Sequence, residues 1–154
     1  IVEEAAAQVR SLAEERHVTL EIDARSALIV GNADLLHQVF VNLLANAIEY
    51  SPVGGRVGIV MTRVGGRDVV RVTDHGSGIA SDRADRVFER FFREDPSRVT
   101  ATGGHGLGLA VCRSIMRGHR GDVVLHPTPG GGATFEVQFA ASQAAADRDH
   151  VNES

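Results

Sequence analysis

The chain has 154 residues, 43% of them hydrophobic and 23% charged, a balance that fits one globular domain and is far from that of a disordered chain. Sixteen basic residues, all arginine, and 20 acidic residues give a formal net charge of −4, which argues against a whole-domain nucleic-acid binder. The single cysteine, Cys112, excludes an internal disulfide and a cysteine-based zinc site. No apolar run reaches spanning length, so we expect this stretch to be soluble, and the lone cysteine is compatible with a cytoplasmic location.

The N-terminal third shows helix and strand patterns in turn. Residues 3–15 place apolar side chains on one stripe, which predicts an amphipathic helix. Residues 17–23 alternate apolar and polar side chains, and 27–30 form a short apolar run, so both are predicted strands. Asn32 is the predicted N-cap of the best-defined helix, which Ser51-Pro52 ends.

The middle of the chain predicts a hairpin followed by a polar stretch. Residues 57–64 and 68–73 flank Gly65-Gly66, the pattern of two antiparallel strands joined by a tight turn. A short helix is predicted over 81–88. Residues 93–105 contain Pro, Ser, Thr and Gly but almost no apolar anchor, so we expect this stretch to be mobile.

The C-terminal third predicts a helix over 107–116 and a closing strand pair, 122–125 with 133–139. The sequence after Ala140 loses its periodicity. We therefore expect one domain over 1–140 and a frayed or helical tail over 141–154.

Two asparagines interrupt the apolar pattern of the long helix. Asn42 and Asn46 are four residues apart, so both amides project from the same face. A satisfied structural pair would explain them. Side-chain amide oxygens are also suitable ligands for a magnesium ion that bridges phosphate oxygens, and two on one face favour that interpretation.

A carboxylate follows the second strand of the predicted hairpin. Asp74 precedes Gly76 and Gly78, a pattern that by itself is often just a turn. At a strand end, however, the carboxylate can accept a hydrogen bond from an adenine amino group, which guanine lacks, and the glycines let backbone approach a ligand.

Two further segments are rich in glycine. Residues 103–110 run from a loop into a helix, where unpaired backbone N–H groups and the helix dipole favour phosphate. Residues 130–135 contain a glycine run that, taken alone, is best explained as a hairpin turn.

In this order, these segments resemble the GHKL ATPase/kinase superfamily and, within it, the catalytic domain of sensor histidine kinases. The resemblance covers nearly the whole chain to about Ala140. Residues 42–47 are similar to the family's N box, 74–79 and 104–110 to its first two glycine boxes, 88–93 to its F box and 130–134 to its last glycine box. It implies an α+β fold of the Bergerat type, a two-layer α/β sandwich with a mixed, mostly antiparallel sheet packed against helices and a mobile ATP lid.

The resemblance also implies ATP and Mg²⁺ as cofactors and assigns residues to them. Asn46 would bind the metal, and Asn42, Asn46 and Arg93 would serve the transfer step. The implied nucleotide contacts are Asn42, Asn46, Tyr50, Asp74, Gly76, Gly78, Ile79, Arg90, Arg93, Gly104, His105, Gly106, Leu107, Gly108 and Thr134. Phe88, Phe91 and Phe92 would anchor the base of the lid. Glu49 departs from the family, which often has a phosphate-binding Lys there.

Family members that hydrolyse ATP have a Glu at the position of Asn42, and an Asn cannot act as a base. None of the seven histidines has the context of the family's phosphoacceptor. We therefore expect a protein-histidine kinase domain that phosphorylates a histidine on a separate dimerisation domain of the same protein, with a response regulator downstream. The parent would be a membrane-anchored homodimer with this domain on the cytoplasmic side. The alternatives are a serine kinase of the anti-sigma-factor type and, because of Glu49, a nucleotide-binding regulatory module with little kinase activity.

Overall fold

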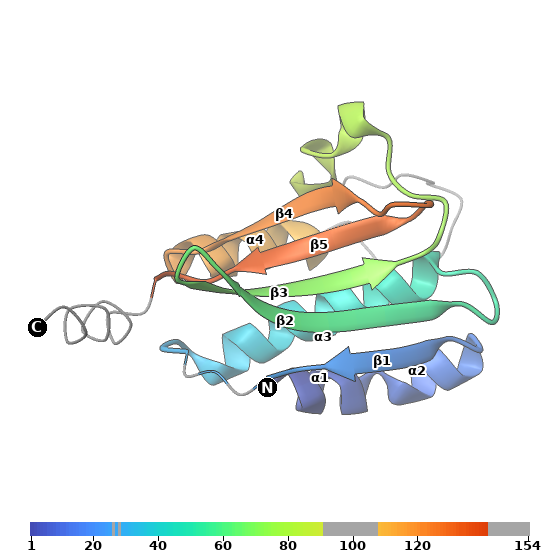
Figure 1. Cartoon of the computed structure of the whole chain (residues 1–154), viewed down its shortest axis with the longest axis horizontal. Coiled ribbons are helices and arrows are strands. Elements are labelled where there is room, and N and C mark those ends of the chain that lie inside the picture. Colours follow the sequence, from blue (N-terminus) through green and yellow to red (C-terminus); the bar gives the residue numbers. More distant parts are fainter. Residues whose placement is uncertain (26, 28, 91–107, 142–154) are drawn as a thin grey trace, which may run out of the picture.

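The computed structural model describes residues 1–25, 27, 29–90 and 108–141, and in them helices cover one face of a five-stranded sheet (Figure 1). The helices are α1 (Val2–Gln8), α2 (Arg10–Glu15), α3 (Ala33–Tyr50) and α4 (Gly108–Gly118), with two 3-10 turns, η1 (Ser81–Arg83) and η2 (Arg86–Phe88). The strands are β1 (Thr19–Asp23), β2 (Arg56–Val64), β3 (Arg67–Asp74), β4 (Asp122–Pro127) and β5 (Ala133–Gln138).

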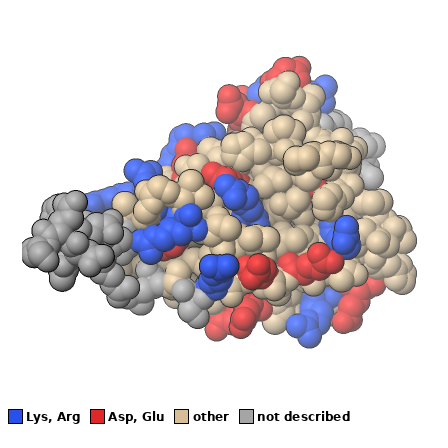
Figure 2. Space-filling model, viewed as in Figure 1, with Lys and Arg blue, Asp and Glu red and all other residues tan. Residues whose placement is uncertain are grey.

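The strand order in the sheet is β1-β2-β3-β5-β4. β1 pairs with β2 in parallel, and the other three pairings are antiparallel. The predicted two-layer α+β architecture with a mixed, mostly antiparallel sheet is therefore confirmed. The uncovered face of the sheet carries arginine and acidic side chains interspersed among uncharged ones (Figure 2).

The β2–β3 hairpin fixes which way the end of β3 faces. Gly65 and Gly66 form the two-residue turn with φ of 56° and 76°, the left-handed conformation that glycine adopts readily. From this turn the register brings Asp74 opposite Val57. Val57 is fully buried, and side chains alternate along β3, so Asp74 points to the helix-covered face.

Helix α3 begins and ends where the sequence predicts. The Asn32 side chain accepts a hydrogen bond from the backbone N–H of Leu35 at 3.0 Å, and the helix continues to Tyr50. The Asn32 backbone N–H donates to Nε2 of His119, which connects this helix start to the end of α4. A fully buried stripe packs α3 onto the sheet: Val39, Leu43, Leu44, Ala47 and Ile48.

Three of the predicted elements need correction. The strand predicted over 27–30 is wrong, because the described residues there form no strand and Val30 is 93% exposed. The helix predicted over 3–15 is interrupted at Val9, which stays buried and so preserves the apolar spacing across the break. The helix predicted over 81–88 consists of two short 3-10 turns.

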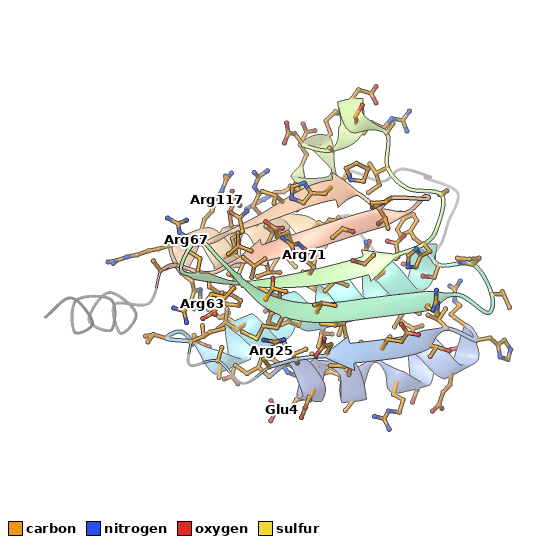
Figure 3. All side chains as sticks on the ribbon, in the orientation of Figure 1. Glu4, Arg25, Arg63, Arg67, Arg71 and Arg117 are labelled. Atoms are coloured by element: carbon orange, nitrogen blue, oxygen red, sulfur yellow. The ribbon has the colours of Figure 1, made fainter. Side chains whose placement is uncertain are left out.

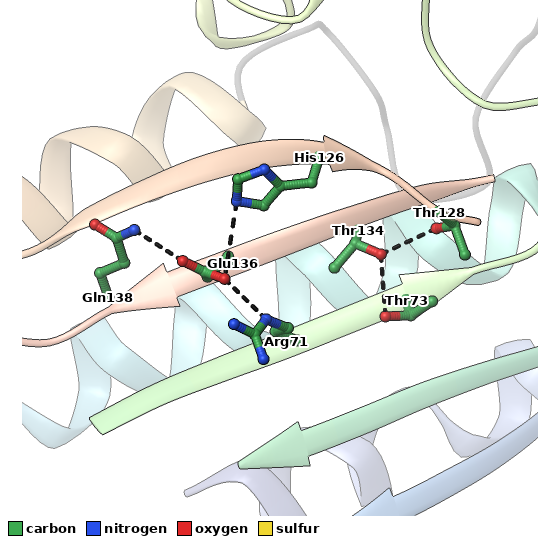
Figure 4. A network of polar contacts seen from close by, with 7 residues as sticks. All are labelled: Arg71, Thr73, His126, Thr128, Thr134, Glu136 and Gln138. Carbon is green, nitrogen blue, oxygen red and sulfur yellow. Dashed lines mark hydrogen bonds and ion pairs between the residues drawn. The ribbon is translucent and has the colours of Figure 1, made fainter. Parts of the chain in front are cut away.

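The outward-facing side chains of β3 and β5 pair across the strands. Arg71 Nε donates to Oε2 of Glu136 at 2.8 Å, and Gln138 donates to the other carboxylate oxygen at 2.8 Å (Figure 4). Burial raises the pKa of Glu136, but these hydrogen bonds and the charges of Arg71 and His126 outweigh it and leave the pKa below its usual value. Arg71 lies over the middle of the sheet, whereas Arg63 and Arg67 lie at its turn end (Figure 3).

Candidate nucleotide-binding site

A buried carboxylate lies at the C-terminal end of β3. Asp74 is 2% exposed, and its Oδ1 accepts hydrogen bonds from the backbone N–H groups of Gly76 at 3.0 Å and Ala133 at 3.2 Å. Burial raises the pKa of Asp74 more than these bonds and the charge of His75 lower it. In the part of the chain that the structure describes, both bonds use Oδ1, so Oδ2 remains as an acceptor for a ligand.

Three chain segments approach one another closely at Asp74: the end of α3, the loop after β3 and the glycine run before β5. A Cβ on Gly76 would overlap the carbonyl oxygen of Tyr50, and a Cβ on Gly132 would overlap the carbonyl of Asp74. A Cβ on Gly78 would lie 3.1 Å from the Gly132 carbonyl oxygen. The sequence interpretation of Gly76 and Gly78 was close approach to a ligand, whereas the approaches seen here join protein backbone to protein backbone.

The two asparagines of α3, Asn42 and Asn46, lie at the edge of the hydrophobic core. Both are half-buried, and their four-residue spacing places them on one face of the helix. Asn42 Nδ2 lies 3.5 Å from the carbonyl oxygen of Gly108, the first residue of α4. Asn46 is one turn closer to Tyr50, whose carbonyl contacts the Asp74 loop. Along α3, Asn42 therefore lies beside the start of α4, and Asn46 lies nearer the end of the helix that contacts the Asp74 loop.

Thr134 lies on the other face of the sheet from the Asp74 side chain. Its Oγ1 is 3.2 Å from Oγ1 of Thr73, the residue opposite it in the register, and neighbouring residues of β3 point to opposite faces (Figure 4). Its Oγ1 is also 2.9 Å from Oγ1 of Thr128, which donates to the Asp74 carbonyl oxygen at 3.2 Å. Thr134 thus supports the backbone of Asp74, and the structure does not bring its hydroxyl to the carboxylate.

Two residues that hold Asp74, Ala133 and Thr128, could not be predicted from the sequence. Ala133 contributes its backbone N–H to Asp74, a contact for which no side-chain type gives a signal. Thr128 holds the Asp74 carbonyl from a turn before the glycine run, and only the pairing of β4 with β5 reveals that proximity.

The remaining predicted residues divide into two groups. Ile79 packs against the core, Tyr50 is half-buried and Arg90 is exposed. Arg93, Gly104, His105, Gly106 and Leu107 lie outside the described residues, as do the predicted lid over 93–105 and the tail from 142 onward.

The described residues contain no group of three or more His, Cys, Asp or Glu side chains that could hold a metal ion. Among the described helices none is long and apolar enough to cross a membrane.

A mixed sheet with a buried carboxylate at the end of a strand and a helix that carries two asparagines agrees with the Bergerat fold that the resemblance implies. Residues 31–143 match the family described as histidine kinase-, DNA gyrase B-, and HSP90-like ATPase, and the chain belongs to that family. Membership implies that the domain binds ATP.

The curated relatives are more specific than the family. The chain is 43% identical over 140 residues to the sensor-like histidine kinase SenX3 of Mycolicibacterium smegmatis, covering 90% of this chain and 36% of SenX3. It is 39% identical over 130 residues to the sensor histidine kinase RppB of Synechocystis, covering 83% of this chain and 29% of RppB. The chain thus spans about a third of the length of these relatives, and its predicted resemblance to the catalytic domain of sensor histidine kinases is confirmed.

Solved structures agree. The mycobacterial sensor histidine kinase MprB superposes with a TM-score of 0.79 at 27% identity, covering 90% of each chain. The catalytic domain of histidine kinase ThkA gives 0.76, and at 22% identity, with 91% of each chain covered, it supports the fold alone.

Proposed function

We propose that this domain binds ATP with Mg²⁺ and donates the γ-phosphoryl group to a histidine on a separate dimerisation domain of a longer protein. The observation that carries the proposal is the buried Asp74 carboxylate: two backbone N–H groups hold its Oδ1, and among the described residues none donates a hydrogen bond to its Oδ2. The crystal structure of full-length ShkA in complex with AMPPNP supports the proposal. It is similar to this chain with a TM-score of 0.74 at 28% identity, covering 94% of this chain and 30% of ShkA.

Asp74 suits an adenine base. A buried carboxylate oxygen can accept a hydrogen bond from an exocyclic amino group, which adenine presents where guanine has a carbonyl. The charge makes that bond stronger than a bond to a neutral acceptor. Because the contacts of Gly76 and Ala133 fix the orientation of the carboxylate, it needs no rearrangement on binding.

Asn42 and Asn46 suit the phosphate end of the ligand. Amide oxygens are hard ligands that fit magnesium, which when bound would neutralise phosphate charge during transfer. The first turn of α4, whose initial carbonyl contacts Asn42, adds backbone N–H groups and a positive dipole end. Arg90 and Arg93 would approach the phosphates from the segment that follows η2.

The nucleophile has to come from outside this domain. Asn42 has no basic atom with which to take a proton from water, so the site favours positioning and charge neutralisation over water activation. In the parent protein we propose a dimerisation domain as the acceptor and a response regulator as the later recipient. We also propose that the parent is a membrane-anchored homodimer with this domain on the cytoplasmic side, which fits relatives named sensor kinases.

The transfer test uses the isolated domain, γ-labelled ATP and a separately prepared dimerisation helix pair from the parent protein. We expect the label on a histidine of the helix pair, recognised because phosphohistidine is lost in acid and survives in base. A helix pair with that histidine changed to alanine is the control. Label on serine would support the anti-sigma-type alternative, and nucleotide binding without transfer would support the regulatory module.

Magnesium ligation by Asn46 predicts a specific change in ion dependence. In Asn46→Ala we expect the magnesium concentration for half-maximal ATP binding to rise at least about tenfold, because one oxygen ligand is lost. The matched control is Gln38→Ala, an exposed polar residue of the same helix. A magnesium titration in which Asn46→Ala coincides with the unmodified domain would contradict metal ligation by this residue.

A further inference from the structure

Arg113, in the middle of α4, joins three elements. Its guanidinium carbon lies 4.7 Å from the ring centroid of Phe88, at the end of η2. Its Nε donates to Oδ1 of Asp122 at 3.0 Å and its Nη2 lies 3.5 Å from Oδ2, at the start of β4. We call these three side chains the Arg113 clasp.

The clasp is fixed on both sides. Phe88 is buried and meets the fully buried Phe135 edge to face, with ring centroids 6.1 Å apart. Burial raises the pKa of Asp122, but hydrogen bonds from Arg113 and the Val123 N–H, with the charges of Arg113 and Arg117, outweigh it and lower the pKa. The carboxylate therefore stays charged near neutral pH, and the Arg113 side chain is only 22% exposed.

The position of the clasp relates it to the phosphate end of the site. η2 and α4 are the described elements on either side of residues 91–107, and Arg113 holds them together. Gly108, five residues before Arg113 on the same helix, contacts Asn42. A shift of α4 against η2 would thus move the first turn of α4 relative to α3.

The adenine end of the site is built without the clasp. Asp74 is held by Gly76, Ala133 and Thr128, and its loop packs on Tyr50 and Gly132. None of these residues contacts Arg113 among the contacts that the structure describes. Loss of Arg113 should therefore affect the two ends of the site differently.

Resting on the proposed function, we propose that Arg113 is a positioning residue for the phosphate end of the site. Through Phe88 and Asp122 it sets the placement of the first turn of α4 against Asn42. It does not itself contact the nucleotide.

The experiment compares Mg-ATP with adenosine, which lacks phosphates, by calorimetry. In Arg113→Met, which keeps an unbranched apolar stem, we expect affinity for Mg-ATP to fall about tenfold, within the usual range of coupling between sites, and affinity for adenosine to stay within about twofold. Arg113→Lys retains a cation for Phe88 and Asp122 and should recover most of the loss.

The matched control is Arg117→Met. Arg117 Nε also lies 3.6 Å from Oδ1 of Asp122, but Arg117 is one turn further toward the end of α4 (Figure 3), and the cation–π contact described for Phe88 is with Arg113. We expect both affinities of this variant to equal those of the unmodified domain.

A folded Arg113→Met that binds Mg-ATP normally, or that loses ATP and adenosine equally, would overturn the positioning role. If that variant does not fold, Phe88→Leu removes the aromatic face from the other side, and the same comparison decides the question. Failure of the unmodified domain to bind Mg-ATP would instead count against the proposed function.

Discussion

Asp74→Asn is expected to lose nearly all affinity for ATP while the domain stays folded. The substituted amide can still accept the N–H groups of Gly76 and Ala133 through its oxygen, but it presents an NH₂ donor where adenine also donates. A hydrogen bond to a charged group contributes roughly 1.5–3 kcal/mol, and the donor–donor contact adds to its loss, so we expect affinity to fall at least about 100-fold. Fluorescence titration with ATP measures it, and unchanged affinity would remove Asp74 from adenine recognition.

The stability of the same variant gives an independent check. Because burial raises the pKa of Asp74 from 3.8, protonation favours the folded state, and this contribution is present below pH 3.8 and lost as pH rises through the higher folded pKa. At neutral pH the buried charge costs stability, so Asp74→Asn should melt at the same or a higher temperature than the unmodified domain. Its advantage should shrink as pH falls toward 3.8.

Gly132→Ala is expected to be the most damaging single methyl group that can be added near the site. Gly132 has φ of 110°, a conformation that residues with a Cβ rarely adopt, and the new Cβ would overlap the Asp74 carbonyl. Strain and overlap together should lower the free energy of unfolding by about 3 kcal/mol or more. Urea denaturation measures that loss, and ATP affinity should fall as well, because Ala133 moves with its neighbour.

Gly130→Ala, in the same turn, separates strain from overlap. Gly130 also has positive φ, 87°, but nothing lies within 4 Å of the position of its Cβ. We expect a loss of about 1–2 kcal/mol, the usual cost of a left-handed residue. Equal losses in the two variants would show that the contact between Gly132 and Asp74 contributes nothing.

Where local chemistry decides the structure, the sequence was sufficient. The Asn32 cap, the Ser51-Pro52 stop and the Gly65-Gly66 turn are each determined by neighbouring residues, and all three are confirmed. The strand predicted over 27–30 was wrong because a strand also needs a partner strand, and strand pairing depends on the whole sheet. The break at Val9 could not be predicted, because a buried valine at this position fits one continuous apolar stripe as well as two separate helices.

The polar side chains of the candidate site could be predicted from the sequence, but its backbone contacts could not. Asp74 and the asparagine pair are visible as polar residues in apolar surroundings. The amide of Ala133 carries no such signal, and the sequence does not show toward which face of the sheet Thr134 of β5 points. Arg113 lies in an amphipathic helix where an arginine needs no explanation, so its contacts with Phe88 and Asp122 emerge only in three dimensions.

The two-residue turn of the β2–β3 hairpin makes the length of β3 critical for the direction of the Asp74 side chain. Side chains alternate from Arg67 to Asp74, so inserting or deleting one residue within β3 would rotate the carboxylate to the outer face, beside Thr134. Substituting an outward residue of β3 leaves the direction of the carboxylate unchanged, whereas changing the number of residues between the turn and the acid by one reverses it. The number of residues in β3 therefore matters to the site as much as the identity of its last residue.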